Sequence, residues 1–358
     1  MGTTDDRRDD PIAESGAVQI GVVVVHWNSP ALLLDCLRHL RLQSRPPDAI
    51  LVVDNASQAF DEAGLRRRFP DIELTRLDEN RGFAGGANQG ARLLPHCDWI
   101  AFLNPDAHPE PGWLAALASA SLRYPEAGAL ASQMHKLDTA DRLDGTGDLY
   151  HLSGRVWRRD EGCPVQASER EEGEVFSACG GTAVYRGEVF RALGGFDERF
   201  FCYLEDVDLG FRLRLAGYRC IYVPHARVRH LGSAVTKRGS DFSVYYGHRN
   251  LVWTFVKNMP GPLLWALLPY HLLLNLATLA HFAARGRGAI LWQAKRDALR
   301  DLPRALEQRR AIQARRRATL NGIWRVLEKG RPWPRCRSGT APPPEARGQP
   351  SHRRRDPP

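Results

Sequence analysis

The sequence predicts an α/β fold in which a mainly parallel sheet is covered by helices on both faces. Continuous apolar runs rich in Val, Ile and Leu occur at residues 18–27, 49–53 and 99–103, and such runs are typical of strands buried on both faces. Segments with helical periodicity lie between these runs, and alternating strands and helices favour a parallel sheet.

The remaining elements of the sheet domain follow the same alternation. Residues 31–43 repeat apolar positions at helical spacing, and another helix is expected to begin near residue 85. A further strand is expected at 72–80. Residues 134–175 are polar and irregular, which predicts an excursion from the sheet, and dense apolar patterning returns over 176–232.

The composition is that of a globular protein with a sizeable core, with 43% hydrophobic and 25% charged residues. The net charge of +9 favours an anionic partner such as a nucleotide, a lipid phosphate or nucleic acid. Seven cysteines without a CxxC pair argue against a disulfide framework or a structural zinc site and favour a reducing compartment. The N-terminal MGTTDDRRDDP has no apolar core, so neither a signal peptide nor an anchor is predicted there.

Polar side chains follow three predicted strands at the points where the strands end. They are His26, Trp27 and Asn28, then Asp54 and Asn55, then Asn104, Pro105 and Asp106. Because ligands bind beyond the carboxyl ends of parallel strands, we expect these groups in one crevice. Asp54 could accept hydrogen bonds from a base or a ribose there, and a helix cap or turn is the alternative.

The glycine-rich segment at residues 79–90, ENRGFAGGANQG, allows backbone to approach a ligand closely. It lacks the G-x-G-x-x-G spacing, and no P-loop Lys-Ser/Thr follows it. Dinucleotide binding and P-loop hydrolysis are therefore disfavoured, whereas Arg81 could face a phosphate. A plain glycine-rich turn is the alternative.

Three carboxylates lie close together at the start of a predicted helix, namely Glu205, Asp206 and Asp208. Carboxylates are favourable at a helix N-terminus, and ordinary capping is the simpler interpretation. Like charges this close also raise one another's pKa, which suits a general base. The apolar FFCYL directly before them favours a partly buried site.

Two further positions suit a metal site. Asp106 follows a buried strand, and Mg²⁺ or Mn²⁺ takes one or two carboxylates together with phosphate oxygens and water. His230, at the end of HARVRH, could also bind the metal. The alternatives are a type I turn around Asp106 and a structural histidine.

Six short motifs follow one another along the chain in this order: VVVHWNSP, VVDNAS, NRGFAGGANQG, FLNPDA, GGFDERFFCYLEDVDLGFRLRLAGY and RHLGSA. Together they resemble the family 2 glycosyltransferases with a GT-A fold, most closely their rhamnosyltransferase-like branch. The resemblance covers residues 18–260. It implies an inverting transferase that moves a sugar from a nucleotide-sugar, with dTDP-rhamnose favoured and UDP- or GDP-sugars open, to an acceptor hydroxyl.

The resemblance also implies roles at the matched positions. The nucleotide-sugar site would comprise His26, Asn28, Asp54, Asn80, Gly82, Asn88 and Asn104. Asp106 would hold Mg²⁺ or Mn²⁺ as the last residue of the DxD-type motif, whose first position is Asn104 here, and His230 would complete the metal shell. Asp206 would be the general base, while Glu205 would bind the acceptor or orient the site. The excursion 134–175 would shape the acceptor site.

The C-terminal part, residues 261–330, is expected to be a membrane-associating helical region. Residues 263–284 are apolar and would span about 33 Å as a helix. Four polar residues form one stripe on that helix: His271, Asn275, Thr278 and His281. We therefore expect this helix to lie in the membrane interface or pack on the domain rather than span. A basic stretch follows and favours anionic lipid.

These expectations define a cytoplasmic protein, peripheral on the inner face of the plasma membrane. Its acceptor would be a lipid-linked or polysaccharide glycan of the cell envelope, and no nucleic-acid module is visible. A sugar nucleotidyltransferase is one alternative, although HWNSPALLL lacks the glycine-rich loop it would need. A non-catalytic membrane-bound scaffold is the other. Residues 1–17 and 331–358 are polar or rich in Pro and Arg, and are expected to be disordered.

Overall fold

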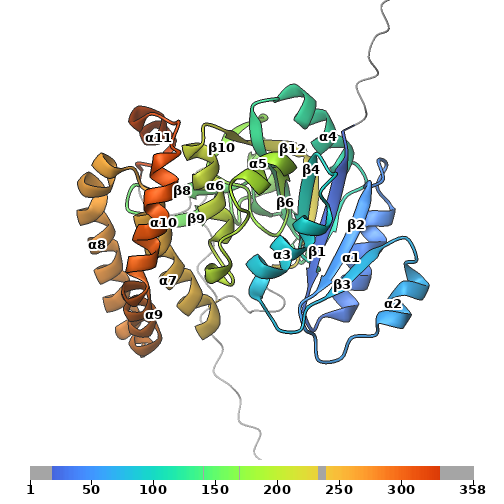
Figure 1. The fold of residues 1–358 in the computed structure, drawn as a ribbon, viewed down its shortest axis with the longest axis horizontal. Helices are drawn as coiled ribbons and strands as arrows, with labels where there is room; N and C mark the ends of the chain where they lie inside the picture. The colour runs from blue at the N-terminus through green and yellow to red at the C-terminus, as the bar shows by residue number, and fades with distance from the viewer. Residues whose placement is uncertain (1–17, 140, 169, 233–238, 331–358) are drawn as a thin grey trace, which may run out of the picture.

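A computed structural model describes residues 18–139, 141–168, 170–232 and 239–330 (Figure 1). The two termini expected to be disordered lie outside these ranges. The strands are β1 Ile20–His26, β2 Ala49–Asp54, β3 Glu73–Arg76, β4 Trp99–Leu103, β5 Ala107–Pro109, β6 Ala127–Lys136, β7 Leu143–Gly145, β8 Asp148–Tyr150, β9 Val156–Arg158, β10 Gly173–Val175, β11 Ala183–Arg186 and β12 Arg219–His230. The helices are α1 Pro30–Arg41, α2 Glu62–Arg68, α3 Gly82–Leu93, α4 Trp113–Arg123, α5 Gly187–Ala192, α6 Glu205–Leu215, α7 Asp241–Asn258, α8 Gly261–Ala283, α9 Gly288–Arg300, α10 Leu302–Ala314 and α11 Leu320–Val326.

One large sheet organises the described part of the chain. Its strand order is β10-β12-β6-β11-β4-β1-β2-β3, with β5 paired to β12 and β7 to β6. β1 runs parallel to β2 and β4, β2 to β3, and β12 to β6, while β11 is antiparallel to both β4 and β6. The predicted mainly parallel α/β sheet is confirmed. The carboxyl ends of β1, β2 and β4 consequently meet at one edge.

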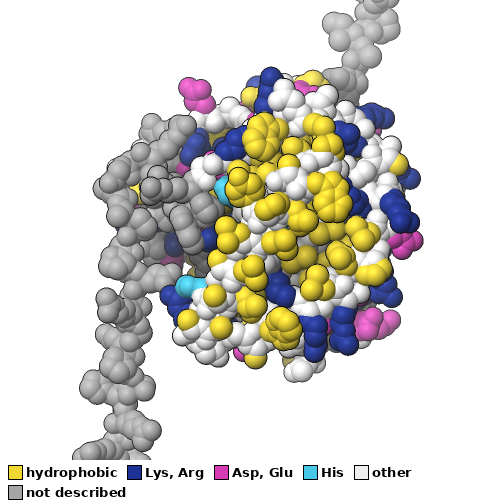
Figure 2. Space-filling view, turned by 90° about the vertical axis from the view of Figure 1, so that its left-hand side faces the viewer, with side chains coloured by type: hydrophobic (Ala, Val, Ile, Leu, Met, Phe, Trp, Pro, Cys, Tyr) yellow, Lys and Arg dark blue, Asp and Glu magenta, His cyan; other side chains and the backbone are white. Residues whose placement is uncertain are grey.

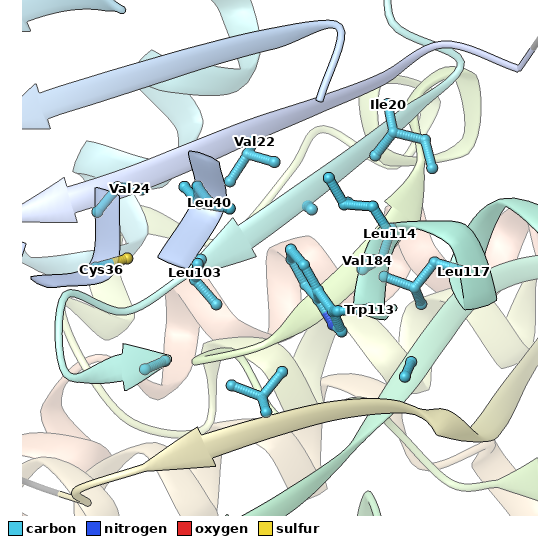
Figure 3. Packing of buried hydrophobic residues seen from close by; sticks show 14 of the residues in the cluster. Ile20, Val22, Val24, Cys36, Leu40, Leu103, Trp113, Leu114, Leu117 and Val184 are labelled. Atoms are coloured by element: carbon cyan, nitrogen blue, oxygen red, sulfur yellow. The ribbon is translucent and has the colours of Figure 1, made fainter. Parts of the chain in front are cut away.

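Two apolar layers cover the faces of this sheet. Ile20, Val22 and Val24 of β1 face one layer, which they form with α1, α2 and α4 (Figure 3). Val23 faces the other layer, which includes α3, α5 and α6. Successive side chains of a strand point to opposite faces, so a strand with a helical layer on each side must be apolar throughout.

The segment expected to be irregular, 134–175, contains short strands instead. β6 extends to Lys136, β7 pairs with β6, and β8 pairs with β9 as a small antiparallel ladder. The expectation was wrong because strands of three residues are too short to show an alternating pattern. Two of them also carry buried carboxylates, Asp144 and Asp148, which read as polar loop in the sequence.

The C-terminal helices form a layer at one end of the molecule (Figure 1). α7 packs against α6, α9 and α10, and α8 packs against α9 and α11. Among the described helices, α8 alone is long and apolar enough to cross a membrane, by length and composition only. His271 of its polar stripe is buried, with Nδ1 2.9 Å from the Ser153 carbonyl oxygen and its ring stacked on Phe255. The stripe therefore begins on the side of α8 that packs on the protein.

Most described cysteines are free thiols: Cys36, Cys97, Cys179, Cys202 and Cys220. Cys163 is disulfide-bonded, which departs from the expectation of reduced cysteines.

Candidate active site

A cleft of about 1560 Å³ opens beside the carboxyl edge of the sheet. Of the predicted site residues, those on its wall are Asn80, Gly82, Asn104, Asp106, Glu205, Asp206 and His230. They come from the start of α3, the segment after β4, the start of α6 and the end of β12. The fold thus brings together segments that are more than a hundred residues apart in sequence.

Asn55, next to the predicted Asp54, anchors one wall of the cleft. Its Nδ2 donates to Asn80 Oδ1 at 2.9 Å and to the Gly82 carbonyl oxygen at 3.0 Å. Its Oδ1 accepts from Arg81 N at 2.9 Å. The end of β2 therefore fixes the start of α3, and Asn55 lines the cleft, where the strand-end pattern places it.

Gly82 occupies a position that excludes a side chain. Its φ is +67°, and a Cβ there would lie 2.2 Å from the Phe201 carbonyl oxygen. Glycine alone accepts both the left-handed conformation and this close approach at little cost. Part of the glycine-rich motif is instead structural, because Cβ atoms at Gly86 and Gly90 would meet Val25 and Val23 of β1 at 2.7 and 2.4 Å.

His26 and Asp54 form a buried pair behind the cleft wall, with His26 Nδ1 3.0 Å from Asp54 Oδ1. Burial lowers the pKa of His26 despite the carboxylate, so the imidazole is neutral. Its Nε2 accepts from Ser29 N, which places the proton on Nδ1. Asp54 Oδ2 accepts from Ser57 N and pairs with Arg76, so Asp54 takes the turn role that the sequence also allowed.

Three predicted donor-site residues, His26, Asn28 and Asp54, are not on the cleft wall. Asn28 Oδ1 accepts from Gln58 N at 2.9 Å. His26, Asp54 and the side-chain oxygen of Asn28 make hydrogen bonds within the β1 and β2 turns, and a direct contact with the nucleotide stays a prediction.

Asn88 also lies away from the cleft. Its Nδ2 donates to the Phe196 carbonyl oxygen at 2.8 Å, and its Oδ1 accepts from Phe196 N at 2.9 Å. It lines a separate cavity of about 720 Å³ between α3, α5 and α10. In this arrangement Asn88 secures the segment before Glu198 rather than facing a donor, because α3 presents it on a different side from Gly82.

Asp106 and His230 lie together on the cleft wall, with His230 Nε2 3.2 Å from Asp106 Oδ1. His230 Nδ1 is 2.8 Å from Asp144 Oδ2, and Asp144 also pairs with Arg158. Burial lowers the pKa of His230, but the two carboxylates outweigh burial and the net pKa is raised. Asp144 orients the ring as outer-shell carboxylates orient metal-binding histidines, and no sequence motif indicated this role for Asp144.

The residues here suit a divalent metal. His230 Nε2 is buried beside Asp106 Oδ1 on the cleft wall, so a bound ion could take both groups as ligands. Among the described residues no group of three or more His, Cys, Asp or Glu side chains forms a metal cluster. One or two protein carboxylates with diphosphate oxygens and water is nevertheless the usual arrangement for Mg²⁺, and Asp106 supplies one such carboxylate.

The second chemical feature is a group of three carboxylates, of which Asp148 and Glu205 are buried and Asp206 is partly exposed. Asp206 Oδ2 accepts from Gly180 N at 2.6 Å and its Oδ1 accepts from Val207 N at 2.8 Å. Burial raises the pKa of Asp206, while the hydrogen bonds from Gly180 and Val207 oppose that rise. Glu205 Oε2 and Asp148 Oδ2 are buried without hydrogen-bond partners.

Burial and the neighbouring Asp206 charge raise the pKa of both Glu205 and Asp148 well above the ordinary carboxyl range. Asp208, the third carboxylate of the motif, is different. It is ion-paired with Arg212 and Lys257, each at 2.8 Å, and is structural. Asp148, rather than Asp208, accompanies Asp206 in the cleft. No local sequence pattern indicated this position of Asp148.

Residues 18–250 match the family described as glycosyltransferase like family 2. The chain belongs to glycosyltransferase family 2. An N-acetylglucosaminyl-diphospho-decaprenol L-rhamnosyltransferase of Mycobacterium tuberculosis is 30% identical to this glycosyltransferase, over 69% of this chain and 88% of the relative. The family assignment decides for a glycosyltransferase over the sugar nucleotidyltransferase alternative.

Solved structures share the fold of this glycosyltransferase. The mannosyltransferase PcManGT of Pyrobaculum calidifontis, in complex with GDP-Man and Mn²⁺, has a TM-score of 0.50 and 23% identity, covering 86% of this chain and 87% of that one. TarS 1–349 of S. aureus, in complex with UDP-GlcNAc, has a TM-score of 0.55 and 16% identity, covering 87% and 93%. The predicted GT-A fold is confirmed.

Proposed function

We propose that this glycosyltransferase moves rhamnose from dTDP-rhamnose, with inversion, to a hydroxyl of a lipid-linked glycan of the cell envelope. The observation that carries the proposal is the carboxylate of Asp206, which lines the same cleft as Asp106 and His230. The choice of sugar and acceptor is supported by the relative that acts as an N-acetylglucosaminyl-diphospho-decaprenol L-rhamnosyltransferase.

The donor would lie along the wall built by Asn55, Asn80, Gly82 and Asn104. Gly82 has no side chain to block the approach of a ligand to its backbone. The side-chain amides of Asn55 and Asn80 are already oriented by their hydrogen bonds. Asp106 and His230 would hold Mg²⁺ or Mn²⁺ at the diphosphate. When bound, the ion would supply positive charge that offsets the charge developing on the leaving nucleoside diphosphate.

Asp206 would act as the general base. It takes the proton of the acceptor hydroxyl while that oxygen attacks the anomeric carbon from the face opposite the diphosphate. The new carbon–oxygen bond forms as the bond to the phosphate oxygen breaks, and the anomeric configuration inverts. A base pKa raised by burial is suited to this role, because a more basic carboxylate accepts the proton more readily.

Peripheral contact with the inner face of the plasma membrane would bring the lipid-linked acceptor to the cleft. The outward side of α8 is apolar and exposes Trp265, Tyr270, Leu272, Leu273 and Leu276. Figure 2 shows apolar side chains gathered on this face with Lys and Arg at its edge. Tyr270 and Leu273 also belong to the cleft wall, so the apolar face is continuous with the cleft. Such a basic-rimmed apolar face suits an anionic lipid surface.

Donor binding is the first test of this proposal. Purified protein is titrated with dTDP-rhamnose and with UDP- and GDP-sugars by calorimetry, with Mg²⁺ or Mn²⁺ and with EDTA, and slow donor hydrolysis is followed in parallel. We expect one donor to bind and be hydrolysed only in the presence of metal. If no donor binds under any condition, the site assignments lose their basis and a non-catalytic scaffold becomes the better account.

A further inference from the structure

The turn immediately before α6 is held in a conformation that ordinary residues disfavour. Phe201, Tyr203 and Leu204 have φ values of 63°, 69° and 64°. L-residues other than glycine enter this left-handed region at a steric cost, and such outliers persist only where surrounding structure enforces them. Glu205 and Asp206 follow directly, so the position of both carboxylates depends on this turn.

A single side chain from α7 binds three carbonyl oxygens of the turn. Asn250 is fully buried, and its Nδ2 lies 3.0 Å from the Phe200 oxygen, 3.0 Å from the Cys202 oxygen and 2.8 Å from the Tyr203 oxygen. The two amide hydrogens are shared among three acceptors. These carbonyls converge because the backbone between them is left-handed.

Arg249 orients this amide and adds contacts of its own. Its Nε donates to Asn250 Oδ1 at 3.0 Å, which fixes Nδ2 toward the turn. Its terminal nitrogen donates to the Arg199 and Phe200 carbonyl oxygens at 2.8 and 3.1 Å. The guanidinium lies 4.3 Å from the ring centroid of Trp253, which restricts its rotamers.

The opposite side of the turn contacts the cleft wall proposed to bind the nucleotide-sugar, here called the donor wall, which includes Gly82. The Phe201 carbonyl oxygen accepts from Ala84 N at 3.2 Å, and Gly82 approaches the same carbonyl. The turn is therefore fixed between α3, which borders the proposed donor site, and α7, which lines another part of the cleft with residues such as Gly247 and Leu251. Neither Arg249 nor Asn250 lines the cleft.

We propose that Asn250, oriented by Arg249, is a positioning residue that holds turn 200–204 and thereby sets Asp206 at the acceptor side of the cleft. The inference rests on the proposed function, since it assumes that Asp206 is the base. Without the amide donor, the Cys202 and Tyr203 carbonyl oxygens lose their hydrogen bonds to Asn250, while the Phe200 oxygen keeps those from Arg249 and Cys202 N. The turn would relax toward ordinary φ values, and the first turn of α6 would shift with it.

The test compares Asn250→Ala and the milder Arg249→Lys with a control, Thr254→Val. Thr254 is equally buried on α7, and its hydroxyl donates only to the Asn250 carbonyl oxygen, so the control loses one hydrogen bond without touching the turn. Three quantities are measured: hydrogen exchange of amides 200–207, the donor Kd, and kcat for transfer at saturating acceptor.

We expect faster exchange at 200–207 in Asn250→Ala and a kcat lowered about 10²-fold, the effect of a catalytic group displaced by about 1 Å. Donor Kd should change less than threefold, since the donor wall keeps its own hydrogen bonds. Arg249→Lys should show the same pattern with a smaller loss, and Thr254→Val should match wild type. If Asn250→Ala does not fold, the Arg249→Lys result decides.

Unchanged exchange and kcat in the folded variants would overturn the proposal. So would equal losses in Asn250→Ala and Thr254→Val, because that result indicates general destabilisation. Failure of the proposed function is distinguishable, since wild-type protein would then show no transfer at all. The exchange measurement would still report whether Asn250 holds the turn.

Discussion

Asp206 is bound by two backbone N–H groups at the start of α6, whereas neighbouring Glu205 has a buried oxygen without a partner. The first arrangement fixes a carboxylate in one orientation, as a base requires. We predict that Asp206→Asn lowers kcat for transfer by about 10²–10⁴-fold, the range for loss of a general base, with donor Kd unchanged. Asp71→Asn, which alters an exposed carboxylate, is the control. Wild-type kcat in Asp206→Asn would contradict the assignment.

The raised pKa of Asp206 has a direct kinetic consequence. The base must be ionised, so kcat should fall as pH decreases through a pKa above the ordinary Asp value of 3.8. Burial and the Asp206 charge raise the pKa of Asp148 well above its ordinary value, so Asp148 is neutral at the pH where Asp206 ionises. Asp148→Asn keeps a neutral group at this position and should therefore leave the acid limb of the kcat profile in place. A limb that moves to lower pH would show that Asp148 is charged beside Asp206.

Glu205 should reduce stability where it is ionised. The pKa of Glu205 is raised in the folded chain. Its favourable contribution to the free energy of unfolding is therefore complete below the ordinary Glu pKa of 4.5 and is lost as pH rises through the folded pKa. We predict that Glu205→Gln raises Tm by about 2–4 °C at pH 8, roughly 1 kcal/mol, and that the difference narrows toward pH 5. A difference independent of pH would indicate a packing effect instead.

Asp106 and His230 should matter most when metal is present. Asp106→Asn should weaken Mn²⁺-dependent donor binding at least about tenfold, the scale of losing a charged ligand, and leave metal-free binding unchanged. Asp144→Asn should have a similar but smaller effect because it orients His230. Calorimetry with Mn²⁺ and with EDTA separates the two conditions. Equal donor Kd values in wild type and Asp106→Asn would exclude Asp106 as a ligand.

Several cleft residues were predictable because they follow a buried strand. Which of two adjacent residues at a strand end faces the cleft was not predictable. Asn104 and Asp106 follow a buried strand and do reach the wall. Asp54 and Asn55 are adjacent, and successive residues point in opposite directions, so only Asn55 faces the cleft. Asp144 and Asp148 are brought in by strands of three residues, and sequence spacing carries no signal for such long-range contacts.

At the scale of elements, α8 combines a face packed on the protein with an exposed apolar face. Leu272 and Leu276 are four residues apart on the exposed face, at 53% and 65% exposure. We predict that Leu272→Ser with Leu276→Ser weakens binding to anionic vesicles about tenfold, since each leucine loses part of its burial energy in lipid. Leu122→Ser, an exposed leucine on α4, is the matched control. Co-sedimentation measures binding, and equal binding of both variants would contradict the membrane proposal.

The boundaries of long elements were predictable because their apolar periodicity is continuous. β4 matches its expected range, α1 begins one residue before its range and β2 ends one residue after its range, while β3 ends at Arg76, four residues before the expected limit of 72–80. The difference arises because Leu77 to Arg81 bend toward the start of α3, held by Asn55. α7 was not recognised as a separate support for the catalytic turn, since its contacts with α6 join distant parts of the chain.

At the scale of the whole molecule, the order of six short motifs carried more information than any one of them. A parallel sheet gathers strand ends along one edge, so motifs in this order must meet in space once the fold is correct. The fold class was therefore predictable. The side of the cleft proposed for the acceptor was predictable only as the excursion 134–175, because α6 and the C-terminal helices also line it and their mutual placement depends on packing rather than on local pattern.

The central claim is inverting transfer by the cleft that contains Asp206. The most direct test incubates the full-length protein with dTDP-rhamnose, Mg²⁺ and an N-acetylglucosaminyl-diphospho-polyprenol in vesicles. Mass spectrometry detects addition of one sugar, and NMR determines the anomeric configuration of the product. The account predicts a single rhamnose in the inverted configuration, and none with Asp206→Asn. A product that retains the donor configuration, or no transfer from any dTDP-, UDP- or GDP-sugar, would contradict it.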